Sequence, residues 1–130
     1  MRFCTVVNCI DGRVQLPVIK YLQKRFNVEY VDSVTEAGPS LTLSEGKDSA
    51  SIQTILKRLK ISIESHNSVG VAIAGHYGCA GNPASQADKI IHIQKATQFV
   101  RQHYKNIEII GLYVDKEWKV HEVIDNKING

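Results

Sequence analysis

The sequence has few cysteines, few prolines, a single tryptophan and no long apolar run. Three cysteines in 130 residues are an odd number and too few for a framework of disulfide bonds. Sparse thiols are more typical of metal binding or catalysis in a reducing compartment. The first apolar run, Phe3–Val7, is too short for a signal peptide or a membrane span. We therefore expect a cytoplasmic protein with no membrane partner.

The sequence also lacks a concentrated block of positive charge. Its 16 lysines and arginines are spread along the chain against 13 acidic residues, which gives a formal net charge of +3 at pH 7. A nucleic-acid surface usually gathers such charge into a stripe. Hydrophobic residues make up 43% of the chain, which is enough to bury a core. We therefore expect one domain over residues 1–130 and no nucleic-acid partner.

Apolar runs predict the strands of a sheet. Four runs rich in apolar or β-branched residues are typical of buried strands. They span residues 3–7, 28–34, 69–74 and 107–114. After a short polar connection, the alternating segment 118–124 predicts a fifth strand, antiparallel to the fourth and at the edge. The residues from Asp125 onward are predicted to form a polar tail.

Helical periodicity fills the segments between the first four strands. The first predicted helix begins near Arg13. Its expected apolar face comprises Leu16, Ile19, Leu22 and Phe26. Asp48 and Ser85 are the predicted N-caps of the next two helices, and residues 41–47 are predicted to form a loop. This alternation predicts an α/β three-layer sandwich with a mostly parallel sheet, in which the strand order is 2-1-3-4 with strand 5 at the edge.

Two cysteines and a histidine follow two of the predicted strands. Cys9 follows the first strand, and His76 and Cys79 follow the third. In the order 2-1-3-4 the chain reverses its winding between these strands and opens a crevice at their carboxyl ends. Zinc favours thiolate and imidazole ligands, and three protein ligands leave a fourth position for water or substrate. The pattern predicts a three-ligand zinc site, and we assign the third cysteine, Cys4, to the core.

Asp11 and Arg13 stand beside the first predicted ligand, and Gly12 is expected to allow a tight turn between them. An arginine can hold a carboxylate in a bidentate pair. Held in this way, Asp11 could accept a proton or a hydrogen bond from metal-bound water. Released, it could reach the metal and occupy the open position. A surface ion pair that only stabilises the turn is the simpler alternative.

Other interpretations of the same loops are less well matched. A phosphatase-like loop is disfavoured because the spacing from Cys9 to Arg13 is too short to cradle a phosphate. The glycine-bearing segment 75–81 could hold a phosphate at the next helix, but it lacks a Walker ending. A thiol enzyme or phosphate binder without metal stays open. Candidate proton shuttles, all expected to be surface histidines, are His66, His92, His103 and His121.

The paired motifs resemble the β-class carbonic anhydrases. The match is Cys9-x-Asp11-x-Arg13 after one strand and His76-x-x-Cys79 after a later one. The resemblance implies zinc held by the two cysteines and the histidine, with Asp11 and Arg13 as the catalytic dyad. It also implies reversible hydration of CO2 to bicarbonate by zinc-bound hydroxide, and a homodimer or higher homo-oligomer. In that family the arginine keeps the aspartate off the zinc in the active form.

The sequence departs from the family pattern at Glu36-Ala37-Gly38, where members often have Asn-Ala-Gly. Glu36 is an extra candidate proton acceptor or metal contact, although a solvated loop carboxylate is the simpler expectation. Cys79 is followed by Ala80-Gly81 and not directly by glycine. The alternatives are therefore a zinc hydrolase of a CO2 analogue, such as carbonyl sulfide or carbon disulfide, and a non-catalytic zinc-binding domain with Asp11 permanently on the metal.

Overall fold

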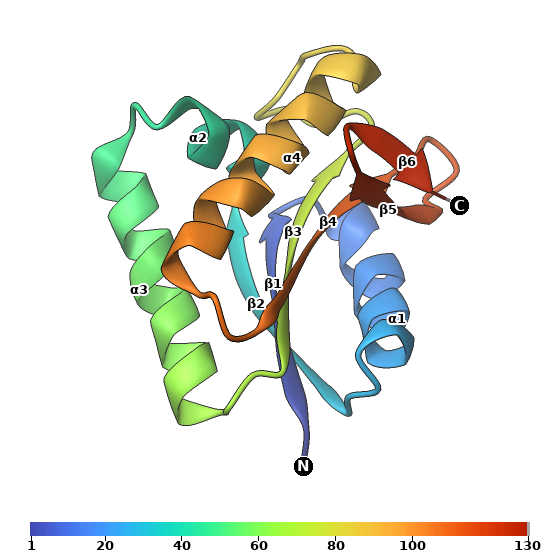
Figure 1. Ribbon diagram of the computed structural model, residues 1–130. Coiled ribbons are helices and arrows are strands. Elements are labelled where there is room, and N and C mark those ends of the chain that lie inside the picture. Colours follow the sequence, from blue (N-terminus) through green and yellow to red (C-terminus); the bar gives the residue numbers. More distant parts are fainter. Residues whose placement is uncertain (130) are drawn as a thin grey trace.

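Six strands form one sheet between two helical layers in the computed structural model, which describes residues 1–129 (Figure 1). The strands are β1 (Phe3–Cys9), β2 (Tyr30–Glu36), β3 (Gly70–His76), β4 (Glu108–Val114), β5 (Val120–Ile124) and β6 (Lys127–Asn129). The helices are a short 3-10 helix (Gly12–Val14), α1 (Gln15–Arg25), α2 (Pro39–Glu45), α3 (Ser49–Ser65) and α4 (Gln86–His103). Figure 1 shows α1 on one face of the sheet and α2, α3 and α4 on the other, so the predicted three layers are confirmed.

The strand order is β2-β1-β3-β4-β5-β6. The pairs from β2 to β4 are parallel, and β5 pairs antiparallel with β4. The predicted order and the antiparallel fifth strand are therefore confirmed. Because β1 and β3 are neighbours while the chain leaves them in opposite directions, the switch point lies between their carboxyl ends.

Apolar side chains on each face of the sheet form a separate core. One core packs α1 against β1, β3 and β4, and the predicted core residue Cys4 is fully buried in it. The other packs α2, α3 and α4 against the opposite face. The predicted caps are confirmed, since Asp48 accepts from the Ser51 N–H and Ser85 from the Asp88 N–H. None of the helices within residues 1–129 is both long and apolar enough to cross a membrane.

The first helix buries only part of the predicted face: Leu22 and Phe26 are buried as predicted, and Ile19 is half-buried. Val14, Val18 and Leu22 are fully buried, whereas Leu16 is 65% exposed. The helix also begins at Gln15, two residues after the predicted start. The predicted face was wrong at Leu16 because the valines, which were not counted in it, set the direction of the helix.

Residues 41–47, predicted to be a loop, belong mostly to α2. Pro39 stands in its first turn, where the missing N–H is tolerated, and Leu43 is buried. Gly46 ends the helix with a φ of 69°. The helix has seven residues, so it is too short for its periodicity to be seen in the sequence.

The predicted polar tail contains β6, which pairs antiparallel with β5. The two strands are joined by Asp125 and Asn126, whose φ angles are 52° and 60°. Short polar side chains tolerate this left-handed conformation, which suits a two-residue hairpin turn. The prediction missed β6 because it has three residues, of which Ile128 alone is apolar.

Candidate metal centre

Cys9, His76 and Cys79 meet at the carboxyl ends of β1 and β3. Their ligand atoms all lie within 4.8 Å of one another, and the two sulfur atoms are 3.8 Å apart. All three residues are buried. The topology thus brings together two cysteines that are 70 positions apart in the chain.

His76 presents one ring nitrogen to this cluster. Its Nδ1 donates to the carbonyl oxygen of Tyr77 at 2.7 Å, which leaves the lone pair on Nε2. The Nε2 atom is buried and has no hydrogen-bond partner within the described residues. A buried acceptor without a partner is costly, and a backbone carbonyl that fixes the tautomer is typical of metal-binding histidines. The donor set therefore fits a metal ion.

Cys9 is prepared to be a thiolate. Burial raises the pKa of its thiol, but this is outweighed by the adjacent His76 side chain and by hydrogen bonds from the main-chain N–H groups of Gly38 and Asp11. The net result is a pKa of about 6, well below the usual value for cysteine. Cys9 therefore carries negative charge at neutral pH.

Cys79 has the opposite balance. Burial and the nearby charge of Cys9 raise the pKa of its thiol, although the main-chain N–H groups of Gly81 and Asn82 act in the other direction. Two thiolates 3.8 Å apart repel each other unless a cation lies between them. The second sulfur therefore retains its proton until a cation binds.

Main-chain contact between two glycines holds the sulfur-binding N–H groups in place. Gly38, at a φ of 62°, precedes α2, and Gly81 follows Cys79. A Cβ atom at Gly38 would lie 2.7 Å from the carbonyl oxygen of Gly81, and one at Gly81 would lie 2.7 Å from the carbonyl carbon of Ala37. Each glycine supplies an N–H group to one of the two sulfurs. The contact between Gly38 and Gly81 thus joins the segment that donates to the Cys9 sulfur to the segment that donates to the Cys79 sulfur.

Two amide side chains hold the turn after β1. The Asn8 carboxamide accepts from the Cys9 N–H at 2.9 Å and donates to the Val14 carbonyl at 3.3 Å. The Gln15 carboxamide donates to the carbonyl oxygens of Cys9 and Asp11, at 2.8 and 2.9 Å. Sequence reasoning missed both, although a buried asparagine that ends an apolar run is a visible signal.

Gly12 does not have the role predicted for it. It lies in the 3-10 helix, is absent from the residues with positive φ, and a Cβ atom there would meet nothing within 4 Å. The side-chain cap that Asp11 provides to the Arg13 N–H bends the chain, so the turn does not require glycine.

Asp11 and Arg13 form the predicted two-pronged pair. Arg13 Nη2 donates to Asp11 Oδ2 at 2.6 Å, and Nε donates to Oδ1 at 3.0 Å. Arg13 Nη2 also donates to the carbonyl oxygen of Gly78 at 3.3 Å, so the pair joins the two loops. These hydrogen bonds from Arg13 hold the pKa of Asp11 far below its usual range. The carboxylate therefore stays ionised at any physiological pH.

Trp118 supports the arginine and was not identified from the sequence. Its ring lies under the Arg13 guanidinium, with Cζ 4.7 Å from the ring centroid. The predicted strand began at Trp118, but β5 begins at Val120. Trp118 instead lies in the β4–β5 turn at a φ of 64°, where its N–H donates to the Asp115 carbonyl. The turn therefore positions the ring beside the dyad.

Glu36 is not the solvated loop carboxylate that we expected. It ends β2, next to Cys9 in the sheet register, and forms an ion pair with Arg58 of α3. The expectation was wrong because the sequence gives no sign that α3 brings an arginine to this position. With its charge already paired, Glu36 is a weaker candidate for proton transfer.

The four other histidines lie outside the cluster of ligand atoms. His66 and His103 are exposed, as predicted, and His92 is half-buried against Asn82. The prediction was wrong for His121, whose side chain is only 12% exposed and whose Nε2 bonds Asp115 at 2.7 Å. The β4–β5 hairpin folds it inward.

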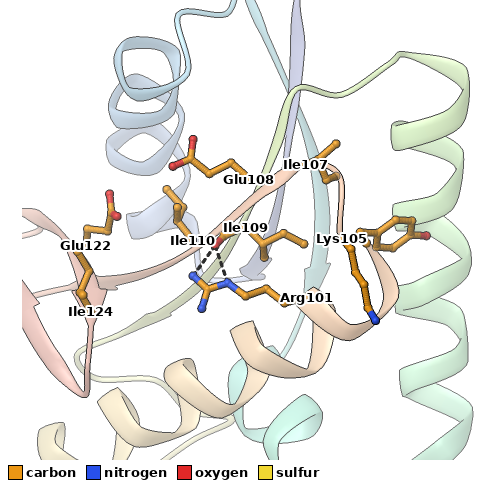
Figure 2. Close-up of a pocket in the computed structure, with 9 residues that line it drawn as sticks. Arg101, Lys105, Ile107, Glu108, Ile109, Ile110, Glu122 and Ile124 are labelled. Carbon is orange, nitrogen blue, oxygen red and sulfur yellow. Dashed lines mark hydrogen bonds between the residues drawn. The ribbon is translucent and has the colours of Figure 1, made fainter.

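A pocket of about 550 Å³ lies at the opposite edge of the sheet, where β4 begins (Figure 2). Several of its charged groups are paired within the chain. Arg101 donates twice to the carbonyl oxygen of Ile109, and Arg25 pairs with Glu108 and Glu122. Figure 2 shows no cysteine or histidine among the side chains drawn there. This pocket therefore offers no thiolate or imidazole to a metal ion.

Comparison with known proteins agrees with this arrangement. A family model described as "Putative carbonic anhydrase" matches residues 1–124. A carbonic anhydrase from Glaciozyma antarctica has a TM-score of 0.64 at 14% identity, covering 93% of this chain and 81% of that one. The β-carbonic anhydrase CcaA has a TM-score of 0.62 at 12% identity, covering 98% and 84%. Tetrameric β-carbonic anhydrases from Sordaria macrospora give 0.51 at 10% identity, covering 92% and 79%. No curated protein matches the sequence.

Proposed function

The chain belongs to the carbonic anhydrase family whose model it matches, and on that premise we propose that it is a zinc enzyme that reversibly hydrates CO2 to bicarbonate. One observation carries the proposal. Three buried ligand atoms lie within 4.8 Å of one another, beside a carboxylate that an arginine holds. Cys9, His76 and Cys79 would hold the metal, and Asp11 with Arg13 would act on the substrate side.

The ligand set supports zinc as the metal. Two thiolates and one imidazole are ligands that zinc favours, and the buried Nε2 of His76 is an acceptor with no other partner among the described residues. Zinc, when bound, supplies a water acidic enough to lose its proton near neutral pH. The low pKa of Cys9 favours metal capture because a thiolate needs to lose no proton.

Asp11 would orient the attacking oxygen. Because the hydrogen bonds from Arg13 keep its carboxylate ionised, Asp11 can accept a hydrogen bond and direct a lone pair of that oxygen toward the carbon of CO2. The new C–O bond yields bicarbonate, and the proton lost by water passes to solvent buffer. Its low pKa makes Asp11 a poor store for that proton, so its role is positioning.

Arg13 would decide where Asp11 points. Its guanidinium is held by the carboxylate, by the Gly78 carbonyl and by the face of Trp118. These three contacts oppose the rotation that would turn Asp11 toward the metal. They favour an enzyme over a domain in which Asp11 is a permanent fourth ligand.

Large apolar side chains exposed around the loops support an oligomer. Ile10 is 64% exposed, Leu16 65% and Tyr77 51%. Apolar surface near a site is typical of a contact between subunits, and relatives from Sordaria macrospora are tetrameric. We propose a homodimer or a higher homo-oligomer. The three cysteines are unpaired, which supports the predicted reducing, cytoplasmic compartment.

Metal analysis combined with stopped-flow CO2 hydration tests the proposal. The expected result is one zinc per chain, hydration activity, and loss of that activity with retention of zinc in Asp11→Asn. A well-folded protein that binds no zinc would overturn the proposal. Turnover of carbonyl sulfide or carbon disulfide without turnover of CO2 would overturn the choice of substrate.

A further inference from the structure

A second pocket, of about 370 Å³, opens beside the candidate metal centre on the side of α4. The loop after β3 and the first turn of α4 line it, together with Lys89 and Tyr113. Cys79 borders it as well, so the pocket and the metal centre share a wall. Asp11 and Arg13 are not among its lining residues. The proposed reaction therefore leaves this pocket without a role.

Lys89 brings a buried positive charge to the pocket. The residue is 5% exposed, and its Nζ donates to the carbonyl oxygen of His76 at 3.0 Å. An ammonium group has three donors, and in the described part of the chain no carboxylate lies within ion-pair distance of this one. A buried cation is normally paired because its desolvation is costly. Lys89 is thus suited to bind an anion.

Tyr113 brings a second donor to the same pocket. The residue is 1% exposed, and its hydroxyl makes no hydrogen bond within residues 1–129 but is not fully enclosed, so the oxygen stays accessible from the pocket. Burial raises the pKa of Tyr113, so the hydroxyl keeps its proton and can donate it in a hydrogen bond. Buried tyrosine hydroxyls usually find a partner. The pocket that Tyr113 lines is where such a partner can reach it.

The start of α4 adds a favourable electrostatic environment. Gln86 is the first residue of this 18-residue helix and lines the pocket. The positive end of the helix dipole, and N–H groups without an intrahelical acceptor, favour an anion there. Of the nearby acids, Asp88 is exposed, and Asp115, whose charge contributes to the raised pKa of Tyr113, is hydrogen-bonded to His121. Three independent features therefore favour the same charge.

We propose that this pocket binds a small oxyanion between Lys89 Nζ and Tyr113 Oη, and that the anion is bicarbonate. The choice of bicarbonate rests on the proposed function, because bicarbonate would be released at the adjoining metal centre. The oxyanion site itself rests only on the buried ammonium of Lys89, the unpartnered hydroxyl of Tyr113 and the helix terminus. The anion accepts a charge-assisted hydrogen bond from Lys89 and a neutral one from Tyr113.

Titration of the zinc-loaded full chain with bicarbonate, and separately with inorganic phosphate, tests the site. Amide resonances of Gln86 and Ala87 report binding at the pocket, and those of residues 9–13 report binding at the metal. The test variants are Lys89→Met and Tyr113→Phe, which preserve side-chain bulk. Lys95→Met is the matched control, because Lys95 is an exposed lysine on the same helix.

Bicarbonate should shift the Gln86 and Ala87 resonances of the unaltered protein. We expect the affinity to fall by about tenfold or more in Lys89→Met and by about fivefold in Tyr113→Phe, and to be unchanged in Lys95→Met. If Lys89→Met does not fold, the affinity of Tyr113→Phe for bicarbonate alone tests whether the pocket binds the anion. Tighter binding of phosphate supports the oxyanion site but assigns it to another ligand.

Equal affinity in the unaltered protein and both test variants would overturn the inference. So would shifts confined to residues 9–13, which would place the anion on the metal. Failure of the proposed function would give a different result from failure of the oxyanion site. A protein without CO2 hydration activity that still binds an oxyanion through Lys89 and Tyr113 keeps the pocket and loses only the argument for bicarbonate.

Discussion

The two loops of the candidate metal centre differ in charge and in exposure. The first loop, residues 9–13, contains a cysteine whose pKa is lowered to about 6 and a charged pair that reaches solvent. The second loop, residues 76–82, contains a buried imidazole and a cysteine whose pKa is raised. The first loop therefore provides negative charge before any metal binds, and the second acquires its charge with the metal. In the proposed function both loops supply metal ligands, whereas only the first supplies the residues that act on the substrate.

Removing a proposed ligand from either loop should have the largest effect, a loss of zinc affinity that is similar for the two loops. Cys9→Ser and Cys79→Ser should each lower zinc affinity by roughly a thousandfold or more, because each removes one of three ligands. Competition with a chromophoric chelator measures the affinity. Cys4→Ala is the matched control, since this cysteine is buried away from the cluster and should leave zinc binding unchanged. Full zinc affinity in either serine variant would contradict the site.

Neutralising the acid of the first loop should separate catalysis from ligation. Asp11→Asn should lower kcat/KM for CO2 by on the order of a hundredfold while zinc stays bound, because a positioned acceptor is lost. Glu36→Gln is the matched control at the same edge of the sheet. Its carboxylate is paired with Arg58, so we expect kcat/KM to stay within about twofold of the unaltered value. Equal losses in the two variants would contradict the role given to Asp11.

Adding one methyl group should distinguish the glycine that links the loops from the glycine that does not. Gly38→Ala should lower the free energy of unfolding by about 1–3 kcal/mol, because its φ is positive and the new Cβ meets the Gly81 carbonyl. Gly12→Ala should stay within about 0.5 kcal/mol, because nothing lies within 4 Å. Urea unfolding of both variants measures the difference. Equal stability would show that the loops are not in firm contact.

The smallest expected effect is a difference in thiol pKa between the two loops. A pH titration of the metal-free protein measures this difference directly. One thiolate, that of Cys9, should form with a midpoint near pH 6, while Cys4 and Cys79 stay protonated. Since the folded pKa lies below the ordinary value of 9.0, Cys9 stabilises the fold increasingly as pH rises from about 6 toward 9, and this contribution is lost again on acidification. Thiolate absorbance, compared between the unaltered protein and Cys9→Ser, measures it. A midpoint near pH 9 would contradict the asymmetry.

The sequence was sufficient to predict the layers, the strand order and the meeting of Cys9 with His76 and Cys79. Long apolar runs separated by helical segments restrict the topology to few choices, and the switch point then fixes which strand ends are neighbours. The Asp11–Arg13 pair was also predictable, because its partners are two residues apart and interact locally.

Contacts between distant segments were not predictable. Arg58 reaches Glu36, Trp118 reaches Arg13, and Lys89 reaches the His76 carbonyl through elements that leave no local pattern. Gly12 shows the converse error, since a glycine within a motif suggested a conformation that the chain does not adopt. Short elements such as α2 were not predicted, because seven residues are too few to show a helical periodicity.

The contact between Gly38 and Gly81 also restricts how this family member can change over time. A Cβ atom at either glycine would clash with main-chain atoms of the other segment. A smaller side chain at a neighbouring position therefore could not relieve the clash. These two positions are closed to gradual substitution, whereas exposed neighbours such as Ile10 and Tyr77 are open to it. New specificities in a descendant of this chain should therefore arise around the rim of the site, while the spacing of its sulfur atoms is inherited unchanged.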